Sequence, residues 1–240
     1  MKNNRILYPI YDYGKLHVSI SKGNPKMGNI PAFNLLPSDE FLKLGNSTQL
    51  TNIMGTCGKH CELCKNDCYA VRYIKFHHNS TVKEYAANTV IMRQDPDKLR
   101  TEIKEFCDKN IVKYFRFHTA GELESIEQLR TYCDICKDIP DVIFYIYTKA
   151  FDLLQEWTDK GETFPENFVI NLSMWRDNMN DVSCKMRFDN NIFIYDDGSE
   201  NMSDIYHCPA TDKNGHETGV TCAMCRRCMK KRNITAVYAH

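Results

Sequence analysis

The sequence lacks long apolar runs and has no net charge. Both absences exclude some classes of protein. No stretch approaches the ~18 consecutive apolar residues of a membrane-spanning helix, so we expect no membrane partner. Residues 1–13 lack the basic-then-apolar layout of a signal peptide, so we expect a cytoplasmic protein. Basic and acidic residues number 31 each. This balance excludes a globally basic nucleic-acid binder, although a local basic patch stays open.

Several common catalytic motifs are also missing. The chain contains no Walker loop and no Gly-x-Gly-x-x-Gly fingerprint, the two usual signs of a phosphate-binding turn. It contains neither a Gly-x-Ser-x-Gly elbow nor a His-Glu-x-x-His helix, the usual signs of a serine hydrolase and a metalloprotease. The chemistry therefore has to be sought in other residues.

Cysteine is the residue present in excess, with twelve in 240 residues. Cytosolic thiols stay reduced, so a disulfide framework is not expected. Eight of the twelve fall into two clusters in polar segments, a pattern typical of metal ligands. The first cluster is Cys57, Cys61, Cys64 and Cys68, and the second is Cys208, Cys222, Cys225 and Cys228. The other four, Cys107, Cys133, Cys136 and Cys184, are expected to be packing residues.

The close spacing within each cluster lets thiolates converge on one centre, as in zinc sites and iron–sulfur clusters. Runs of three closely spaced cysteines are more typical of iron–sulfur ligation. We therefore predict one or two [4Fe–4S] clusters, with zinc as the alternative. Basic residues near the thiols, such as Lys65 and Arg226, would stabilise their ionised form; a solvated basic surface or a nucleic-acid patch would also explain them.

The central part of the chain alternates helix and strand patterns, which predicts an α/β fold built on a parallel sheet. We expect helices over 97–110, 125–137 and 151–159, and strands over 112–118, 142–148, 168–173 and 191–195. Residues 69–94 suggest one or two helices. An irregular segment, 1–56, would precede this unit of residues 57–197, and a loop-like cysteine-rich segment, 198–240, would follow it.

Polar residues stand where the predicted strands end. The end of the first strand carries Arg116 and His118, with Glu122 just after it; Lys149 follows the next strand, and Ser173 ends a third. In barrel-like folds the active site lies at this edge. We therefore predict catalytic roles for Arg116, His118, Glu122 and Lys149, although ordinary strand-capping residues would give the same pattern.

The spacing Cys57-x3-Cys61-x2-Cys64 resembles that of the radical S-adenosylmethionine superfamily. The segment from Arg116 to Glu122 is similar to the glycine-rich segment that binds that cofactor's amino group. The resemblance implies a partial parallel (βα) barrel and a cluster whose fourth iron binds S-adenosylmethionine. It places Gly121, Glu122 and Ser173 at a cofactor site.

A second resemblance covers most of the chain. The segments that carry it are 26–34, 64–70, 115–122 and 147–149, with the closing cysteines Cys222, Cys225 and Cys228. Together they resemble the gene-product-88 type of protein found in phages and mobile elements. That pattern includes Cys57, Cys64 and Cys68 but not position 61. The ligand set of the first cluster is therefore open between Cys57, Cys61 and Cys64 and this second trio, either of which could combine with the C-terminal cysteines.

Three functional hypotheses follow. The first is an iron–sulfur redox or radical enzyme acting on an unidentified small-molecule or macromolecular substrate, with flavodoxin or ferredoxin as electron donor. If phage-encoded, it would work in the host cytoplasm. The second is a zinc-knuckle protein associated with nucleic acid, which the zero net charge disfavours. The third is an iron–sulfur electron-transfer protein without a substrate of its own.

Overall fold

A computed structural model describes residues 16–38, 41–42, 53–76, 80–181, 187, 189–199, 201–214 and 216–238. Residues 1–15 of the expected irregular segment and Cys184, expected to be a packing residue, lie outside these ranges. None of the helices in the described ranges is both long and apolar enough to cross a membrane.

The centre of the fold is a seven-stranded sheet in the order β1-β2-β5-β6-β7-β8-β9. Its strands are β1 (Ile20–Ser21), β2 (Ala32–Phe33), β5 (Tyr114–Phe117), β6 (Ile143–Thr148), β7 (Phe168–Met174), β8 (Asn191–Asp196) and β9 (Ile234–Tyr238). Only β1 runs antiparallel to its neighbour; all other pairs are parallel. The predicted α/β class is confirmed, and the sheet is open rather than closed into a barrel.

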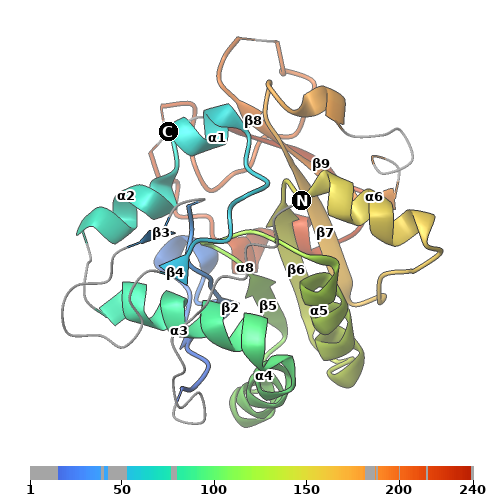
Figure 1. The fold of residues 1–240 in the computed structure, drawn as a ribbon. Coiled ribbons are helices and arrows are strands. Elements are labelled where there is room, and N and C mark those ends of the chain that lie inside the picture. The colour runs from blue at the N-terminus through green and yellow to red at the C-terminus, as the bar shows by residue number, and fades with distance from the viewer. Residues whose placement is uncertain are drawn as a thin grey trace, which may run out of the picture.

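Helices and short turns connect these strands (Figure 1). The helices are α1 (Glu62–Asn66), α2 (Tyr69–Phe76), α3 (Ser80–Gln94), α4 (Pro96–Asn110), α5 (Ile126–Asp138), α6 (Phe151–Asp159) and α8 (Cys222–Cys225). Three 3₁₀ turns, η2 (Pro25–Met27), η3 (Met179–Asp181) and η4 (Arg227–Met229), and a small hairpin of β3 (Phe41–Leu42) and β4 (Ile53–Met54) complete the described elements.

Local signals account for the helix boundaries near the sheet. Asp95 caps α4 by accepting a hydrogen bond from the amide of Lys98 at 3.0 Å, and a proline occupies the first turn, where its missing N–H costs nothing. Ser125 caps α5 through the amide of Gln128 in the same way. The helices predicted over 97–110, 125–137 and 151–159 are therefore confirmed to within a residue.

The sequence prediction fails at the C-terminal end. Residues 198–240 were expected to be loop-like, but residues 234–238 form β9, which pairs in parallel with β8 along its whole length. Five residues are few for a periodicity signal. The strand depends on its neighbour, since Ala236 and Thr235 are buried by the sheet that it joins.

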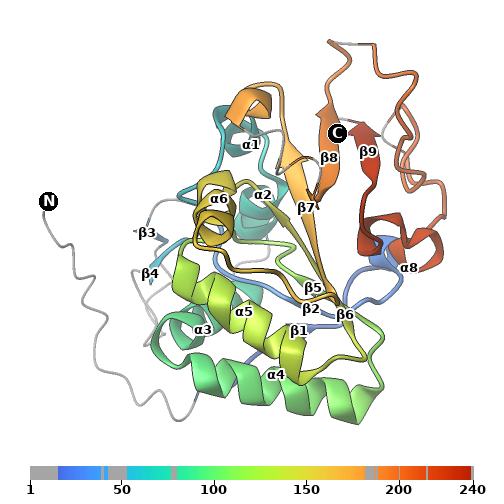
Figure 2. The same cartoon turned by 90° about the vertical axis from the view of Figure 1, so that its right-hand side faces the viewer.

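The two faces of the sheet have different partners. On one face, Phe117 and Phe144 pack with Leu129 of α5 and Trp157 of α6 in the main core, and α4, α5 and α6 lie on this side in Figure 2. Because side chains alternate along a strand, Arg116, Tyr145 and Tyr147 point to the other face, which is covered by η2, α8 and η4. Apolar core residues and polar cavity residues therefore lie on opposite faces of the sheet.

Ile111 offers a test of the local backbone. It follows α4 in the left-handed region at φ 50° with 86% of its side chain exposed, a conformation that is unfavourable for a β-branched residue. Ile111→Gly should raise the free energy of unfolding by about 0.5–1 kcal/mol, measured by urea denaturation. Ile111→Val keeps the β-branch and should change nothing; equal stability of all three proteins would contradict this account.

Candidate functional site

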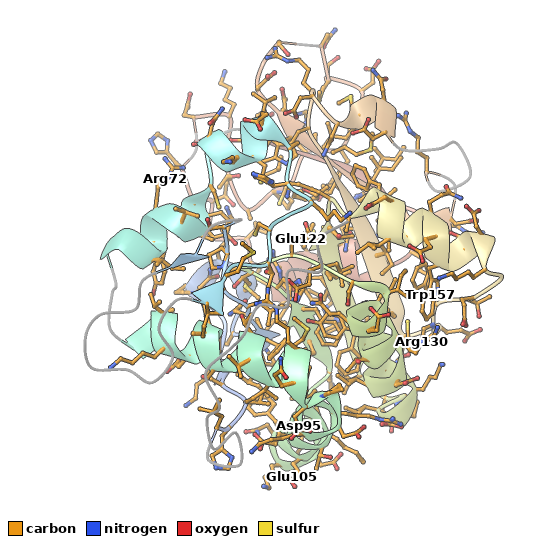
Figure 3. The ribbon with its side chains drawn as sticks, in the orientation of Figure 1. Arg72, Asp95, Glu105, Glu122, Arg130 and Trp157 are labelled. Carbon is orange, nitrogen blue, oxygen red and sulfur yellow. The ribbon has the colours of Figure 1, made fainter. Side chains whose placement is uncertain are left out.

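A cavity of about 720 Å³ lies on the second face of the sheet. It is lined by the carboxyl ends of β5, β6 and β7, by the first cysteine segment and by the C-terminal cysteine segment. Figure 3 shows Glu122 near the centre of the molecule and Arg72 on α2 toward its edge. Residues more than 150 positions apart in the chain, such as Cys57 and Cys222, therefore share one internal surface.

The first cysteine cluster divides into three residues and one. Cys57, Cys64 and Cys68 line the cavity. Cys61, at the N-cap of α1, is not among the residues that line the cavity. Burial raises the pKa of Cys61 to about 12, and the nearby carboxylate of Asp177, which accepts the amide of Leu63 at 2.9 Å, adds to this shift. The structure thus brings Cys57, Cys64 and Cys68 together in the cavity and leaves Cys61 out.

All four cysteines of the second cluster line the cavity: Cys208, Cys222, Cys225 and Cys228. Buried Asn171 of β7 donates to the carbonyl of Cys228 at 3.1 Å, and buried Asn191 of β8 donates to the carbonyl of Lys230 at 2.7 Å. The amide of Cys208 donates to Ala236 of β9 at 2.7 Å. The sheet therefore fixes this segment, including through the strand that sequence reasoning missed.

Gly28 lets the N-terminal turn approach the second cluster. It has φ 71°, and a Cβ there would lie 2.7 Å from the Cβ of Ala223 in α8. Only glycine combines this backbone with so close a contact. Gly28 ends the 3₁₀ turn η2, whose Met27 packs in the same apolar cluster as Cys222.

The thiols lie in surroundings that disfavour their ionised form. Burial raises the pKa of Cys57, Cys64, Cys208 and Cys222, and raises that of Cys228 to about 12. Cations offset part of this effect, because Lys149 lowers the pKa of Cys64 and Arg116 lowers that of Cys222. Since a metal binds the thiolate, binding here would release protons to solvent.

Glu122 and Lys149 form the centre of the first half of the site. The Glu122 carboxylate is buried and accepts the Thr148 hydroxyl at 2.6 Å and the Lys149 amide at 2.9 Å. Burial raises the pKa of Glu122, against the opposing effect of Lys149. For Lys149, burial lowers the pKa, but Cys64 and Glu122 more than reverse that and the net shift is upward. The ammonium therefore stays charged beside the thiols.

Arg116 lies in the half of the cavity that contains the second cysteine cluster. Its Nε donates to the carbonyl of His118 at 2.9 Å, and its guanidinium lies 4.6 Å from the centre of the Tyr147 ring. Tyr147 lies near Cys228 and lowers the pKa of its thiol, against the larger effect of burial. Among the cations of the cavity, Lys149 acts on the first cysteine cluster, whereas Arg116 and Lys26 act on the second.

His118 is a neutral, fixed imidazole. Its Nε2 lies 2.6 Å from the hydroxyl of Tyr132, and that hydroxyl accepts the amide of Gln128 at 2.8 Å. The hydroxyl of Tyr132 thus links the imidazole to the amide of Gln128, while Nδ1 of His118 is buried with no hydrogen-bond partner among the described residues. Burial first, and then Arg116, lowers the pKa of His118 to about 3. A positioning role fits this environment better than proton transfer near neutral pH.

The two remaining predicted residues, Gly121 and Ser173, also line the cavity. Gly121 has φ 92°, and a Cβ there would lie 2.6 Å from the Cβ of Leu35, so packing alone requires glycine. Thirteen of the fourteen residues predicted for the site therefore share the cavity, Cys61 being the exception.

Sequence reasoning missed Tyr145 and Tyr195 of the aromatic wall. Tyr145 faces the cavity beside Arg116, and Tyr195 stacks on Trp175 with ring centres 3.8 Å apart. The alternation of tyrosines at 145 and 147 within a buried strand was the available signal, because residues two apart share a face.

The sulfur atoms that line the cavity are the kind of donor atom that a thiolate-bound metal centre uses. Sulfur ligands suit zinc and iron–sulfur clusters, and seven thiols line the one cavity. As placed, no three histidine, cysteine, aspartate or glutamate side chains of the described ranges are grouped to hold a metal ion. The fit rests on the thiols and the two cations beside them.

The carboxylate of Glu122 can be tested by an isosteric change. Glu122→Gln places an amide NH₂ opposite the Lys149 N–H or the Thr148 hydroxyl, so we expect a loss of about 1–3 kcal/mol in unfolding free energy. Glu156→Gln, at an exposed pair with Lys160, should cost less than about 0.5 kcal/mol. Urea denaturation measures both. Equal effects of the two changes would contradict the assigned role of Glu122.

The neutral state of His118 predicts a pH dependence. The unfolded chain binds a proton near pH 6.5 and the folded one only near pH 3, so stability should fall as pH drops below 6.5, by up to about 1.4 kcal/mol per pH unit. His118→Asn tolerates the φ of 62° and cannot titrate. Urea denaturation between pH 6.5 and 5 should show a shallower slope for the variant, and identical slopes would refute the assignment.

Comparison with known proteins gives one family. A family model described as gene product 88 matches residues 12–231, which is most of the chain. No curated protein and no solved structure matches it. The match covers both cysteine clusters and every cavity cation discussed above. The chain therefore belongs to the gene product 88 family.

Proposed function

We propose that this protein is an iron–sulfur redox or radical enzyme, with one or two [4Fe–4S] clusters held by the cavity thiols and the substrate bound between them. The observation that carries the proposal is the convergence of two distant cysteine segments on one cavity at the carboxyl edge of a parallel sheet. Reactions in parallel α/β folds take place at this edge.

The ligands we propose are Cys57, Cys64 and Cys68 for the first cluster and Cys208, Cys222, Cys225 and Cys228 for the second. Bound clusters would supply one-electron chemistry. The chain's own part is to offset the negative charge of the thiolates, with Lys149 beside Cys64 and Arg116 beside Cys222, and to keep the cavity walls rigid through Glu122 and Tyr147.

A relationship to the radical S-adenosylmethionine barrel is the narrower proposal. It is supported by six parallel strands in chain order from β2 to β9 and by the cavity position of Gly121, Glu122 and Ser173. Such an enzyme takes its electron from a donor such as flavodoxin or ferredoxin. Formation of 5′-deoxyadenosine by the reduced, cluster-loaded protein tests this part, and no such product after full reduction would remove it.

A zinc-knuckle protein that binds nucleic acid is the second candidate. It is favoured by the six basic residues that line the cavity against two acidic ones: Lys26, Arg72, Arg116, Lys149, Arg226 and Arg227 against Asp67 and Glu122. Arg227 is partly engaged, since it donates to Thr235 and stacks on Tyr206. Binding of single-stranded RNA or DNA that weakens steeply with salt, by a zinc-loaded protein, would support this candidate.

The geometry distinguishes two cysteines that the spacing pattern treats alike. Cys64→Ala removes a thiol of the cavity, so the anaerobically purified variant should lose the iron of the first cluster. Cys61→Ala removes a thiol that does not line the cavity, so this variant should keep that iron. Iron and acid-labile sulfide per chain are the measurement.

The reverse pattern would restore the ligand set Cys57, Cys61 and Cys64 and would contradict the assignment made here. Iron absent from both variants and from the unaltered chain would overturn the iron–sulfur proposal itself. Circular dichroism of each variant shows whether a loss of iron follows from unfolding.

A further inference from the structure

Arg116 has donors that the fold leaves unused. Its Nε is bonded to the His118 carbonyl, but among the described residues its two terminal nitrogens have no hydrogen-bond acceptor and no carboxylate within ion-pair distance. A guanidinium cannot lose its charge at physiological pH. An internal cation without a carboxylate is costly unless a ligand supplies the negative charge.

The orientation of this guanidinium is fixed in advance. The hydrogen bond from Nε holds one edge, and the Tyr147 ring at 4.6 Å covers one face. Both terminal nitrogens therefore belong to a rigid fork, the geometry that binds carboxylate or phosphate through two parallel hydrogen bonds.

A second unused group lies beside it. Tyr145 is opposite Arg116 in the pairing of β5 with β6 and so faces the same cavity. Its side chain is 1% exposed, and its hydroxyl has no hydrogen-bond partner among the described residues. Buried hydroxyls are normally paired, so an unpaired one next to an unpaired cation indicates an acceptor that the chain itself does not provide.

The acids of the cavity are already occupied. Asp67 accepts hydrogen bonds from Arg72 at 2.9 Å and Tyr195 at 3.0 Å, and Glu122 is bonded to Thr148 and Lys149. Neither is an acceptor for Arg116 in this structure. The remaining wall near Arg116 is aromatic, with Tyr147 packed edge-on against Phe193 at 4.8 Å between ring centres.

We propose that the cavity binds a small molecule carrying an oxyanion, either a carboxylate or a phosphate ester. The oxyanion accepts from the terminal nitrogens of Arg116 and from the hydroxyl of Tyr145, and the apolar part of the molecule lies against the tyrosine wall. Describing this ligand as the substrate rests on the proposed function; the binding site itself does not.

The experiment is calorimetric titration of the protein as purified anaerobically, with phenyl phosphate, benzoate and the uncharged benzyl alcohol as probes. At least one of the two anions should bind at one site per chain, and benzyl alcohol should not compete with it. A preference for phenyl phosphate would identify a phosphate ester as the natural ligand, and a preference for benzoate a carboxylate.

Three variants locate the site. Arg116→Gln should weaken binding of the anion at least about tenfold, as loss of a charged hydrogen-bond partner does. Tyr145→Phe removes only a hydroxyl without a partner, so it should fold normally and weaken binding several-fold. Arg130→Gln is the matched control, an arginine outside the cavity that is paired with Glu162 at 3.2 Å, and should leave affinity unchanged.

Absence of anion binding would overturn the inference, as would equal losses in Arg130→Gln and Arg116→Gln or an unchanged affinity in Tyr145→Phe. Iron measured on the same sample separates the two proposals. Anion binding by an iron-free protein would support the oxyanion site while removing the cluster, and an iron-loaded protein that binds neither anion would do the opposite.

Discussion

The buried carboxylate of Glu122, which accepts hydrogen bonds from the Thr148 hydroxyl and the Lys149 backbone amide, is the interaction on which the first half of the cavity depends. Glu122 holds the start of the loop after β6 through the Thr148 hydroxyl and the Lys149 amide. That places a charged group beside Cys64 inside the protein. Burial raises the pKa of the Cys64 thiol, and Lys149 is the group that most opposes this shift.

Because side chains alternate along each strand, one face of the sheet carries core residues and the other carries the residues of the cavity. Aromatic and aliphatic residues of β5, β6 and β7 fill the helix-covered face, while Arg116, Tyr145 and Tyr147 occupy the alternate positions. A shift of one residue in register would exchange the two sets. The C-terminal segment is then bonded to the same strands by Asn171 and Asn191. Both cysteine clusters reach the cavity because the sheet supplies the attachment points for each.

Much of this arrangement could be predicted from the sequence, for identifiable reasons. Apolar periodicity and the alternation of helix and strand patterns predicted α4, α5, α6 and the central strands, and polar residues at the strand ends predicted Arg116, Glu122 and Lys149. Spacing alone could not separate Cys61 from Cys64, because the difference is a tertiary one: Cys64 lines the cavity and Cys61 does not. The short strand β9 and the open edge of the sheet depend on long-range pairing, which local patterns do not contain. Tyr145 was missed because an aromatic residue in a buried strand is usually a core residue.

The central claim is that the two cysteine segments form iron–sulfur ligand sets facing one cavity. Electron paramagnetic resonance of the dithionite-reduced, anaerobically purified protein, with iron and sulfide counted on the same sample, tests it most directly. The account predicts about four irons and four sulfides per chain for one cluster, or about eight of each for two, with a signal from a reduced cluster. A colourless protein that contains one or two zinc ions, no sulfide and no such signal would contradict it.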